Sequence, residues 1–284
     1  QALQLIPGPE ALAALTEAAE RLPNELRLSP IGALGRRGDP AAVPTLAGQT
    51  TNEDGKVACA AVVALGFLPC ADTLAALQEL QPKAKPELQA AIADSLLKCA
   101  EGLVRDGKTD DAEALYKKLY VPAQPGHIRA AALTGLAKLD PTASLDLLKE
   151  AVNDADTQIA DAAFGLIRTL PGEGVTQVIA SFLAAAAPER QVILLNALAD
   201  RADPAAGEAV RALLDSAAED VRLAAIAALG RMGDQAAVPA ILKLAATAEG
   251  KARRVARETL DTMPGENVNP QLLAAANGND APLR

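Results

Sequence analysis

The clearest pattern along the chain is a stripe of apolar residues at helical spacing in the segment from Val221 to Leu242, VRLAAIAALGRMGDQAAVPAIL. Counted from Val221 as position zero, positions 0, 3, 4, 7 and 8 are apolar, which is the spacing of one face of an amphipathic helix. The turn signal Gly233-Asp234 separates this helix from another apolar run that begins at Val238. The pattern predicts successive helices that pack through their apolar faces.

A near copy of this segment runs from Leu26 to Leu46, with its Arg, Gly, Gly-Asp and Val-Pro landmarks in register. The same template places the second helix of each of eight hairpins, with starts at Leu26, Val57, Leu88, Ile128, Ile159, Arg190, Val221 and Ala252. Successive starts lie 31 residues apart, except for one interval of 40 that holds a nine-residue insertion. Because one hairpin cannot cover its own apolar face, we expect all eight to stack into a single domain over residues 1–284.

Residues at the helix ends have predicted roles of their own. An Asp-Pro pair precedes several first helices, where Asp is expected to cap and Pro to fit the first turn, at Asp39, Asp140 and Asp203. Glycines near the ends of second helices are expected to let the chain turn, at Gly35, Gly66 and Gly230. The opening helix is predicted at Pro9 to Leu22, and a short C-terminal capping helix at about 268–277.

These units resemble HEAT repeats, in particular the short HEAT-like repeats of the phycobilin-lyase type, over nearly the whole chain. The resemblance implies an all-α fold, a right-handed α-solenoid whose second helices line a concave groove used for binding. One repeat, at about 85–127, is longer than the others. Within it DDAEALYKKLY, residues 110–120, resembles the second half of a tetratricopeptide hairpin.

Composition agrees with this fold and excludes some partners. The chain is 50% hydrophobic but only 2% aromatic and has no Trp, which favours helices built from Ala, Leu, Val and Ile. The net charge of −9 makes nucleic acid an unfavourable partner. No apolar run is long enough for membrane insertion. The chain starts at Gln1, so a soluble cytoplasmic protein and an exported, periplasmic one with a removed signal peptide both remain open.

Residues for catalysis are scarce. His127 is the sole histidine and no His-Glu pair occurs, which excludes the di-iron site of HEAT-repeat hydroxylases that act on deoxyhypusine. No common nucleotide, metal or nucleophile motif is present, so we expect no enzyme activity and no cofactor. Cys70 and Cys99 lie one repeat apart; they either form a disulfide or are buried as small apolar residues.

The predicted function is a non-catalytic scaffold that binds a protein or peptide partner along the concave groove. The alternative is a lyase- or chaperone-type subunit acting on a protein-bound cofactor. Template positions 1, 2, 6, 9 and 10 lie opposite the apolar stripe, on an outer face of each second helix that is expected to face solvent in the concave groove. Apolar residues on this face suggest a binding strip or, alternatively, close packing of neighbouring second helices, at Leu28, Val63, Val192 and Leu223. Tyr116, Tyr120 and His127 in the long repeat form a second candidate surface, although a Tyr there could simply fill a gap. The sequence leaves the oligomeric state open.

Overall fold

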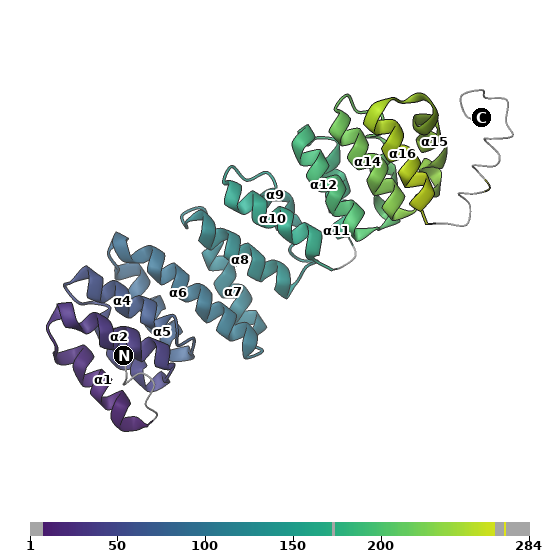
Figure 1. Ribbon diagram of the computed structural model, residues 1–284. Helices are drawn as coiled ribbons and strands as arrows, with labels where there is room; N and C mark the ends of the chain where they lie inside the picture. Colours follow the sequence, from purple (N-terminus) through teal and green to yellow (C-terminus); the bar gives the residue numbers. More distant parts are fainter. Residues whose placement is uncertain (1–7, 172–173, 265–269, 271–284) are drawn as a thin grey trace. The chain divides into compact units, whose positions relative to one another are not determined.

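The computed structural model describes residues 8–171, 174–264 and Pro270, and these residues are all-helical, without a strand (Figure 1). The described part of the chain contains sixteen α-helices, which form eight consecutive pairs as predicted. The first helices of the pairs are α1 (Pro9–Arg21), α3 (Val43–Gln49), α5 (Ala71–Leu80), α7 (Thr109–Leu119), α9 (Leu145–Ala151), α11 (Val175–Leu183), α13 (Gly207–Arg211) and α15 (Val238–Thr247). The second helices are α2 (Asn24–Arg37), α4 (Gly55–Leu65), α6 (Pro86–Arg105), α8 (Gly126–Leu139), α10 (Thr157–Thr169), α12 (Pro188–Arg201), α14 (Glu219–Met232) and α16 (Gly250–Thr262).

Each second helix begins two residues before the start that the sequence template gives it, from α2 at Asn24 to α16 at Gly250. In six of the eight helices the template start is a buried apolar residue that follows a first helical residue outside the core; Leu26 and Arg190 are the exceptions. The 31-residue period, with its one insertion, therefore predicts the register of all eight hairpins. The capping helix predicted at about 268–277 lies outside the described residues, apart from Pro270.

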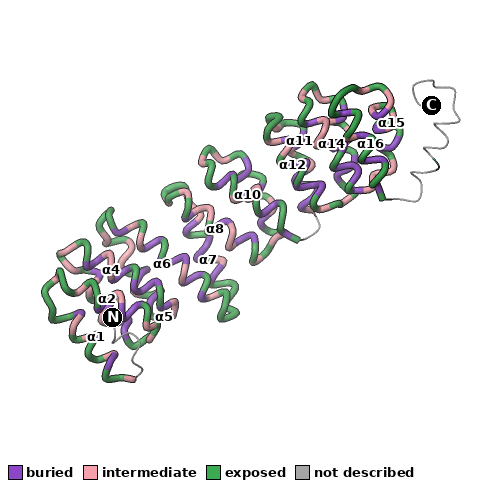
Figure 2. The backbone as a smooth tube through the Cα atoms, in the orientation of Figure 1, coloured by how far each residue is buried: buried purple, intermediate pink, exposed green. Residues whose placement is uncertain are grey.

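The chain divides into two compact units. Unit 1 comprises Gln1–Asp140 and Asp154–Ala162, and unit 2 comprises Pro141–Asn153 and Ala163–Arg284. Within unit 1, α2, α4 and α6 pack side by side, and within unit 2, α12, α14 and α16 do the same. Figure 2 shows buried positions running along these helices next to exposed ones. The prediction of one domain over residues 1–284 stays a prediction.

The inner faces of the second helices form the core of each unit. On α4, Val57, Ala61 and Leu65 are completely buried, and on α14, Val221, Ala225 and Leu229 occupy the same template positions with the same burial. Burying side chains of this size contributes roughly 1.5–3 kcal/mol each for Val and Leu. The predicted apolar stripe is thus the element that holds neighbouring hairpins together.

The glycine prediction was wrong in its mechanism. Gly35 lies inside α2, where a β-carbon would come within 2.9 Å of the Ala64 backbone in α4, so its role is close helix packing. Gly66 likewise lies against the Ser95 side chain of α6. The turns use Gly38 and Gly233, as the Gly-Asp turn signal predicts. These residues are the C-caps of α2 and α14, and their φ angles of 72° and 66° favour glycine.

Polar side chains cap the turns as predicted. Asp39 and Asp203 each accept a backbone hydrogen bond two residues on, at 3.0 Å, and start the short 3₁₀ turns Pro40–Ala42 and Pro204–Ala206. Asp140 differs, because no 3₁₀ helix follows it. All three cysteines are free, so no Cys70–Cys99 disulfide is formed; Cys99 is buried, and this burial raises the pKa of its thiol to about 12.

Candidate functional site

The most apolar exposed surface in unit 1 follows one face of α4. Cys59, Val63 and Phe67 are spaced four residues apart, so their side chains lie on the same side of the helix and of the turn that follows it. Val63 is 39% exposed and Phe67 is 52% exposed, while Cys59 is half-buried. We refer to these three residues as the α4 strip.

A cation lies over the distal end of the α4 strip. The Lys98 ammonium from α6 is 4.8 Å from the centre of the Phe67 ring, a cation–π contact worth roughly 0.5–1 kcal/mol at an exposed site. The same ammonium lies 3.9 Å from an Asp94 carboxylate oxygen. Phe67 is therefore held in place without being covered, and a positive charge stands beside it.

Leu28 begins a second feature at the other end of the α4 strip. It is 39% exposed and, with Cys59, lines an open cleft of about 1210 Å³. The walls of this cleft come from the loop between α3 and α4, the first turns of α4, the end of α5 and the link into α6. The residues at its apolar floor and walls are Leu28, Ala47, Ala58, Cys59, Ala60, Ala76, Leu80, Ala84 and Leu88. We refer to this feature as the edge cleft.

The tyrosines of the long repeat are arranged differently. Tyr116 on α7 is 4% exposed, and its ring fills the space beside Gly135 of α8, where a β-carbon would come within 2.4 Å of it. Burial also raises the pKa of its hydroxyl. Tyr120 is half-buried and His127 is exposed. Of the three residues, only these last two reach solvent to a useful extent.

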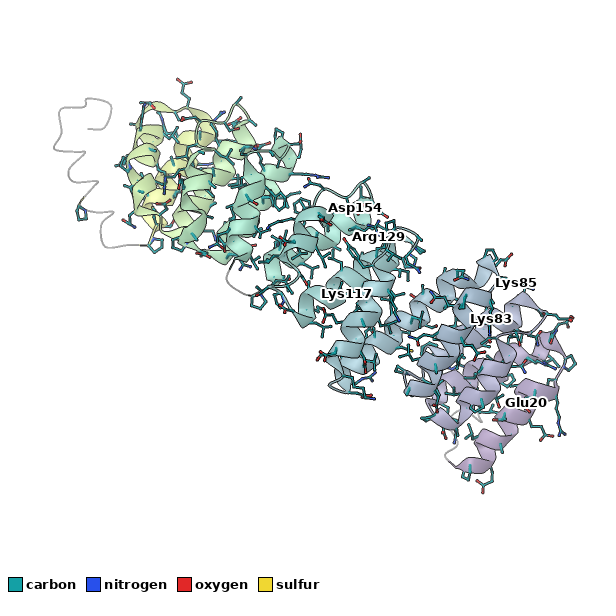
Figure 3. All side chains as sticks on the ribbon, turned by 180° about the vertical axis from the view of Figure 1, so that it is seen from behind. Glu20, Lys83, Lys85, Lys117, Arg129 and Asp154 are labelled. Atoms are coloured by element: carbon teal, nitrogen blue, oxygen red, sulfur yellow. The ribbon has the colours of Figure 1, made fainter. Side chains whose placement is uncertain are left out.

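Tyr120 belongs to a small polar cluster at the start of α8. The Arg129 guanidinium is 5.6 Å from the centre of the Tyr120 ring and donates a 2.7 Å hydrogen bond to Asp154 (Figure 3). Asp154 also accepts from the backbone N–H of Asp156, and this bond, together with Arg129, lowers the pKa of its carboxyl. These contacts link α8 to the loop residues that precede α10.

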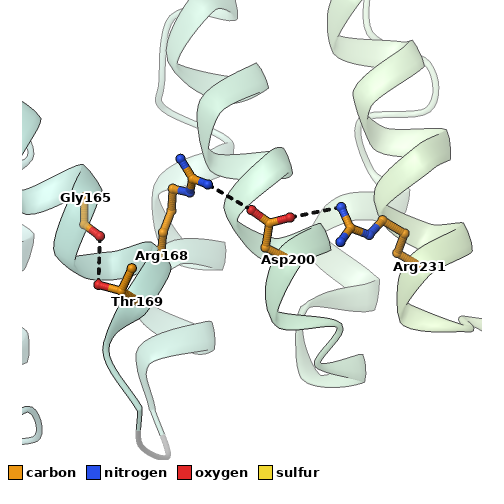
Figure 4. Close-up of polar contacts among 5 residues, drawn as sticks. All are labelled: Gly165, Arg168, Thr169, Asp200 and Arg231. Carbon is orange, nitrogen blue, oxygen red and sulfur yellow. Dashed lines mark hydrogen bonds and ion pairs between the residues drawn. The ribbon is translucent and has the colours of Figure 1, made fainter.

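In unit 2 the predicted apolar positions are less exposed. Val192 on α12 and Leu223 on α14 are both half-buried, whereas Ile193, the residue next to Val192, is 44% exposed. The outer face here is dominated by charge. Asp200 of α12 binds Arg168 of α10 at 3.2 Å with one carboxylate oxygen and Arg231 of α14 at 2.9 Å with the other (Figure 4).

Sequence reasoning missed Phe67 and Lys98 as surface residues. Both stand at template position ten, counted from Val57 and Leu88, and Asp200 and Arg231 stand at the same position in unit 2. A comparison of position ten across the repeats could have found the aromatic–cation pair. The repeat pattern predicts that position ten is exposed, but it does not predict that the side chains of neighbouring repeats meet there.

No helix of the described part is long and apolar enough to cross a membrane. Among the same residues no group of three or more His, Cys, Asp or Glu side chains is placed to hold a metal ion.

Comparisons with solved structures identify chains of similar fold. Kap95p, from a structure of its binding to RanGDP, aligns with a TM-score of 0.60 and 15% identity over 96% of this chain and 43% of its own. Kap121p aligns with a TM-score of 0.54 and 14% identity over 98% of this chain and 37% of its own. This chain thus spans less than half of either protein. The CpcE–CpcF phycocyanin lyase of Nostoc sp. PCC7120 aligns at a TM-score of 0.42 and 17% identity, covering 91% of this chain and 96% of that one.

Comparison by sequence identifies a family but no individual relative. No curated protein matches the chain. A family model described as HEAT repeats matches residues 12–97 and 175–261, which together make up more than half of the sequence. These segments contain the α4 strip, most of its neighbours and the charged outer face of α12 and α14. The chain belongs to the HEAT-repeat family.

Proposed function

We propose that this protein is a non-catalytic scaffold that binds a protein partner on the outer face of the second helices in unit 1, with the α4 strip as the main contact. The observation that carries the proposal is the exposure of Val63 on α4 and of Phe67 in the turn that follows it, 39% and 52%. Single exposed apolar residues are ordinary, but here two large ones are adjacent and continue into the apolar edge cleft. A contiguous surface of this kind is typical of a binding site.

The chemistry of the strip limits the partner. Val63 and Phe67 offer flat apolar contact, and the Lys98 ammonium beside the ring attracts an acidic group at the edge of that contact. We therefore expect a partner segment with apolar side chains and at least one carboxylate. Kap95p, with a similar fold, was solved in a structure of its binding to another protein, RanGDP, which supports a protein partner as the occupant.

Only some of the residues predicted from the sequence belong to the proposed surface. Leu28 and Val63 belong to the proposed surface, and Phe67 is added to them. Tyr120 and His127 remain a second candidate surface, while Tyr116 supports it from within because its ring is buried beside Gly135. Val192 and Leu223 stay predictions for unit 2.

The test compares charge insertion at the same template position in both units. Val63 and Asn196 stand at position six of α4 and α12, and both are exposed. We expect Val63→Glu to weaken binding of the purified partner about tenfold or more, because docking against apolar side chains desolvates the glutamate and its charge repels the acidic group expected on the partner. Asn196→Glu is the matched control and should bind within about twofold, since exposed substitutions change little.

Circular dichroism melts of both variants complete the experiment. Each should melt within a few degrees of the wild-type chain, because an exposed change costs about 0.5 kcal/mol or less. Wild-type affinity in Val63→Glu would contradict the proposal. If Val63→Glu unfolds, Val63→Ser replaces it, and a large loss of stability in Val63→Ser would identify the strip as helix packing.

A further inference from the structure

The edge cleft contains unpaired positive charge. Three lysines line it, Lys56, Lys83 and Lys85, and Figure 3 labels the last two. Lys83 binds Glu79 at 3.0 Å, but neither Lys56 nor Lys85 has an ion-pair partner in the part of the chain that the structure describes. All three side chains are exposed.

Each acidic residue of the cleft has a role within the folded chain. Asp54 accepts a 2.9 Å hydrogen bond from the Lys56 backbone N–H and so caps α4. Glu79 pairs with Lys83, and Glu87 lies in the first turn of α6, where the helix dipole favours a negative charge. These contacts do not cancel the carboxylate charges, so the lining carries three cations and three anions. Lys56 and Lys85 are nevertheless free of ion pairs, and the N-termini of α4 and α6 add the positive ends of two helix dipoles at the cleft.

The positions of Lys56 and Lys85 do not serve helix stability. Lys56 lies in the first turn of α4 and Lys85 is the N-cap of α6, and both are sites where the helix dipole disfavours a cation. Neither lysine offsets this cost with an ion pair. Both charges lie on one cleft, where the carboxylates of a ligand in the cleft can reach them.

The size and lining of the cleft suit a peptide. Its volume of about 1210 Å³ exceeds the roughly 300–1,000 Å³ of pockets for small molecules, and it is open to solvent. Five of its lining residues are alanines, which leave room for the side chains of a ligand. Leu28, Leu80 and Leu88 add larger apolar surface.

We propose that the edge cleft binds a short acidic, apolar segment of the protein partner, whose apolar side chains enter the cleft while its carboxylates pair with Lys56 and Lys85. The segment continues from the α4 strip, because Cys59 belongs to both surfaces. This inference rests on the proposed function and adds the chemistry of the segment that it binds.

Native cysteines supply a probe of occupancy. Cys59 lines the cleft and is partly exposed, whereas Cys70 is equally half-buried but lies outside it. Cys99 is buried, and its raised thiol pKa, about 12, makes it inert. Alkylation by N-ethylmaleimide, followed by mass spectrometry, therefore reports on Cys59 with Cys70 as an internal reference.

The experiment uses two synthetic peptides with the same leucines, one with glutamates between them and the other with lysines. We expect the glutamate peptide to slow alkylation of Cys59 about fivefold or more, because thiol reactivity requires access, while Cys70 is unaffected. The lysine peptide should leave both rates unchanged. Equal effects of the two peptides, or no protection of Cys59, would overturn the inference.

Matched variants locate the effect. Lys85→Glu should weaken binding of the glutamate peptide roughly fivefold or more, since it removes one attraction and adds a repulsion. Lys108→Glu is the control, because Lys108 is likewise an exposed helix N-cap, of α7, but does not line the cleft. Ala76→Phe, which fills the cleft, should abolish protection. Protection that survives in Lys85→Glu and Ala76→Phe would contradict the assignment.

The outcomes separate this inference from the proposed function. If the purified partner binds in a Val63-dependent way but leaves Cys59 reactive and the glutamate peptide gives no protection, the cleft inference fails while the proposed function stands. If the peptide protects Cys59 but Val63→Glu leaves the affinity for the partner unchanged, the α4 strip is not the main contact and the edge cleft remains a binding site.

Discussion

The second helices α4 and α12 occupy the same place in their hairpins but have outer faces of opposite character. At template position six α4 has Val63 and α12 has Asn196; at position ten α4 is followed by Phe67, whereas α12 has Asp200. Phe67 is met by a lysine over its ring, and Asp200 by two arginines. Their inner faces are alike, since Leu65 and Leu198 are both completely buried. The repeat therefore constrains the inner face and leaves the outer face free to differ.

The largest expected effect tests the division between inner and outer face on α4 itself. Leu65→Ala should lower the free energy of unfolding by about 2–5 kcal/mol, because it leaves a cavity in a packed interior. Val63→Ala, two residues earlier, should change it by about 0.5 kcal/mol or less. Urea denaturation measures both. Similar losses for the two variants would mean that Val63 is part of the packing.

A smaller effect compares the tight contact between second helices in the two units. Gly35→Ala places a methyl group against the Ala64 backbone, so it should destabilise the protein by about 1–3 kcal/mol, less a gain of up to about 1 kcal/mol in helix propensity. At the equivalent Gly230 the obstacle is the Thr259 methyl group. Gly230→Ala should therefore be rescued by Thr259→Ser, as a double-mutant cycle would reveal; without rescue, the contact is misassigned.

Acid should lower the stability of both units, because each contains one aspartate whose carboxyl pKa is lowered in the folded state. The pKa of Asp154 is lowered by the Asp156 N–H and Arg129, and that of Asp203 by the Thr176 hydroxyl, the Ala205 N–H and Arg201. Because both folded values lie below the unfolded one of about 3.9, their stabilisation is complete above that pH and is lost as pH falls through the folded values. Urea midpoints between neutral and acid pH should fall less steeply in Asp154→Asn and Asp203→Asn; unchanged slopes would contradict these pKa shifts.

The smallest effect concerns the charged face of unit 2. Asp200→Ala leaves Arg168 and Arg231 without their shared carboxylate, yet all three side chains are well exposed. We expect a loss of about 1 kcal/mol or less at low salt that disappears near 1 M salt, where such charges are screened. Thermal melts at two salt concentrations measure it. A large loss that does not depend on salt would show that the ion pairs of Asp200 with Arg168 and Arg231 are needed for the stability of the fold.

Much of the fold could be predicted because the repeat signal lies in buried positions. Leu229 and Leu34 mark the same template position, and their burial is what the 31-residue period records. In contrast, the sequence assigns both Gly35 and Gly38 to the chain turn, and only the packed structure separates the packing glycine from the turn glycine.

The candidate surfaces were less predictable. Leu28 and Val63 were found from their template positions, but Phe67 was missed, and the edge cleft could not be foreseen. A cleft depends on how two neighbouring loops are spaced, which periodicity does not encode. The burial of Tyr116 depends on Gly135 in the following helix, so only the packed structure could identify its role.

The most direct test of the difference between α4 and α12 is site-specific photocrosslinking from template position ten. A benzoylphenylalanine replaces Phe67 in one variant and Asp200 in another, and adducts are analysed after irradiation in the cells that make the protein. We predict one dominant protein adduct from position 67, lost on adding Val63→Glu, and no comparable adduct from position 200. Equal adducts from both positions, or none from position 67 while position 200 reacts, would contradict the assignment of the α4 strip as the partner-binding surface.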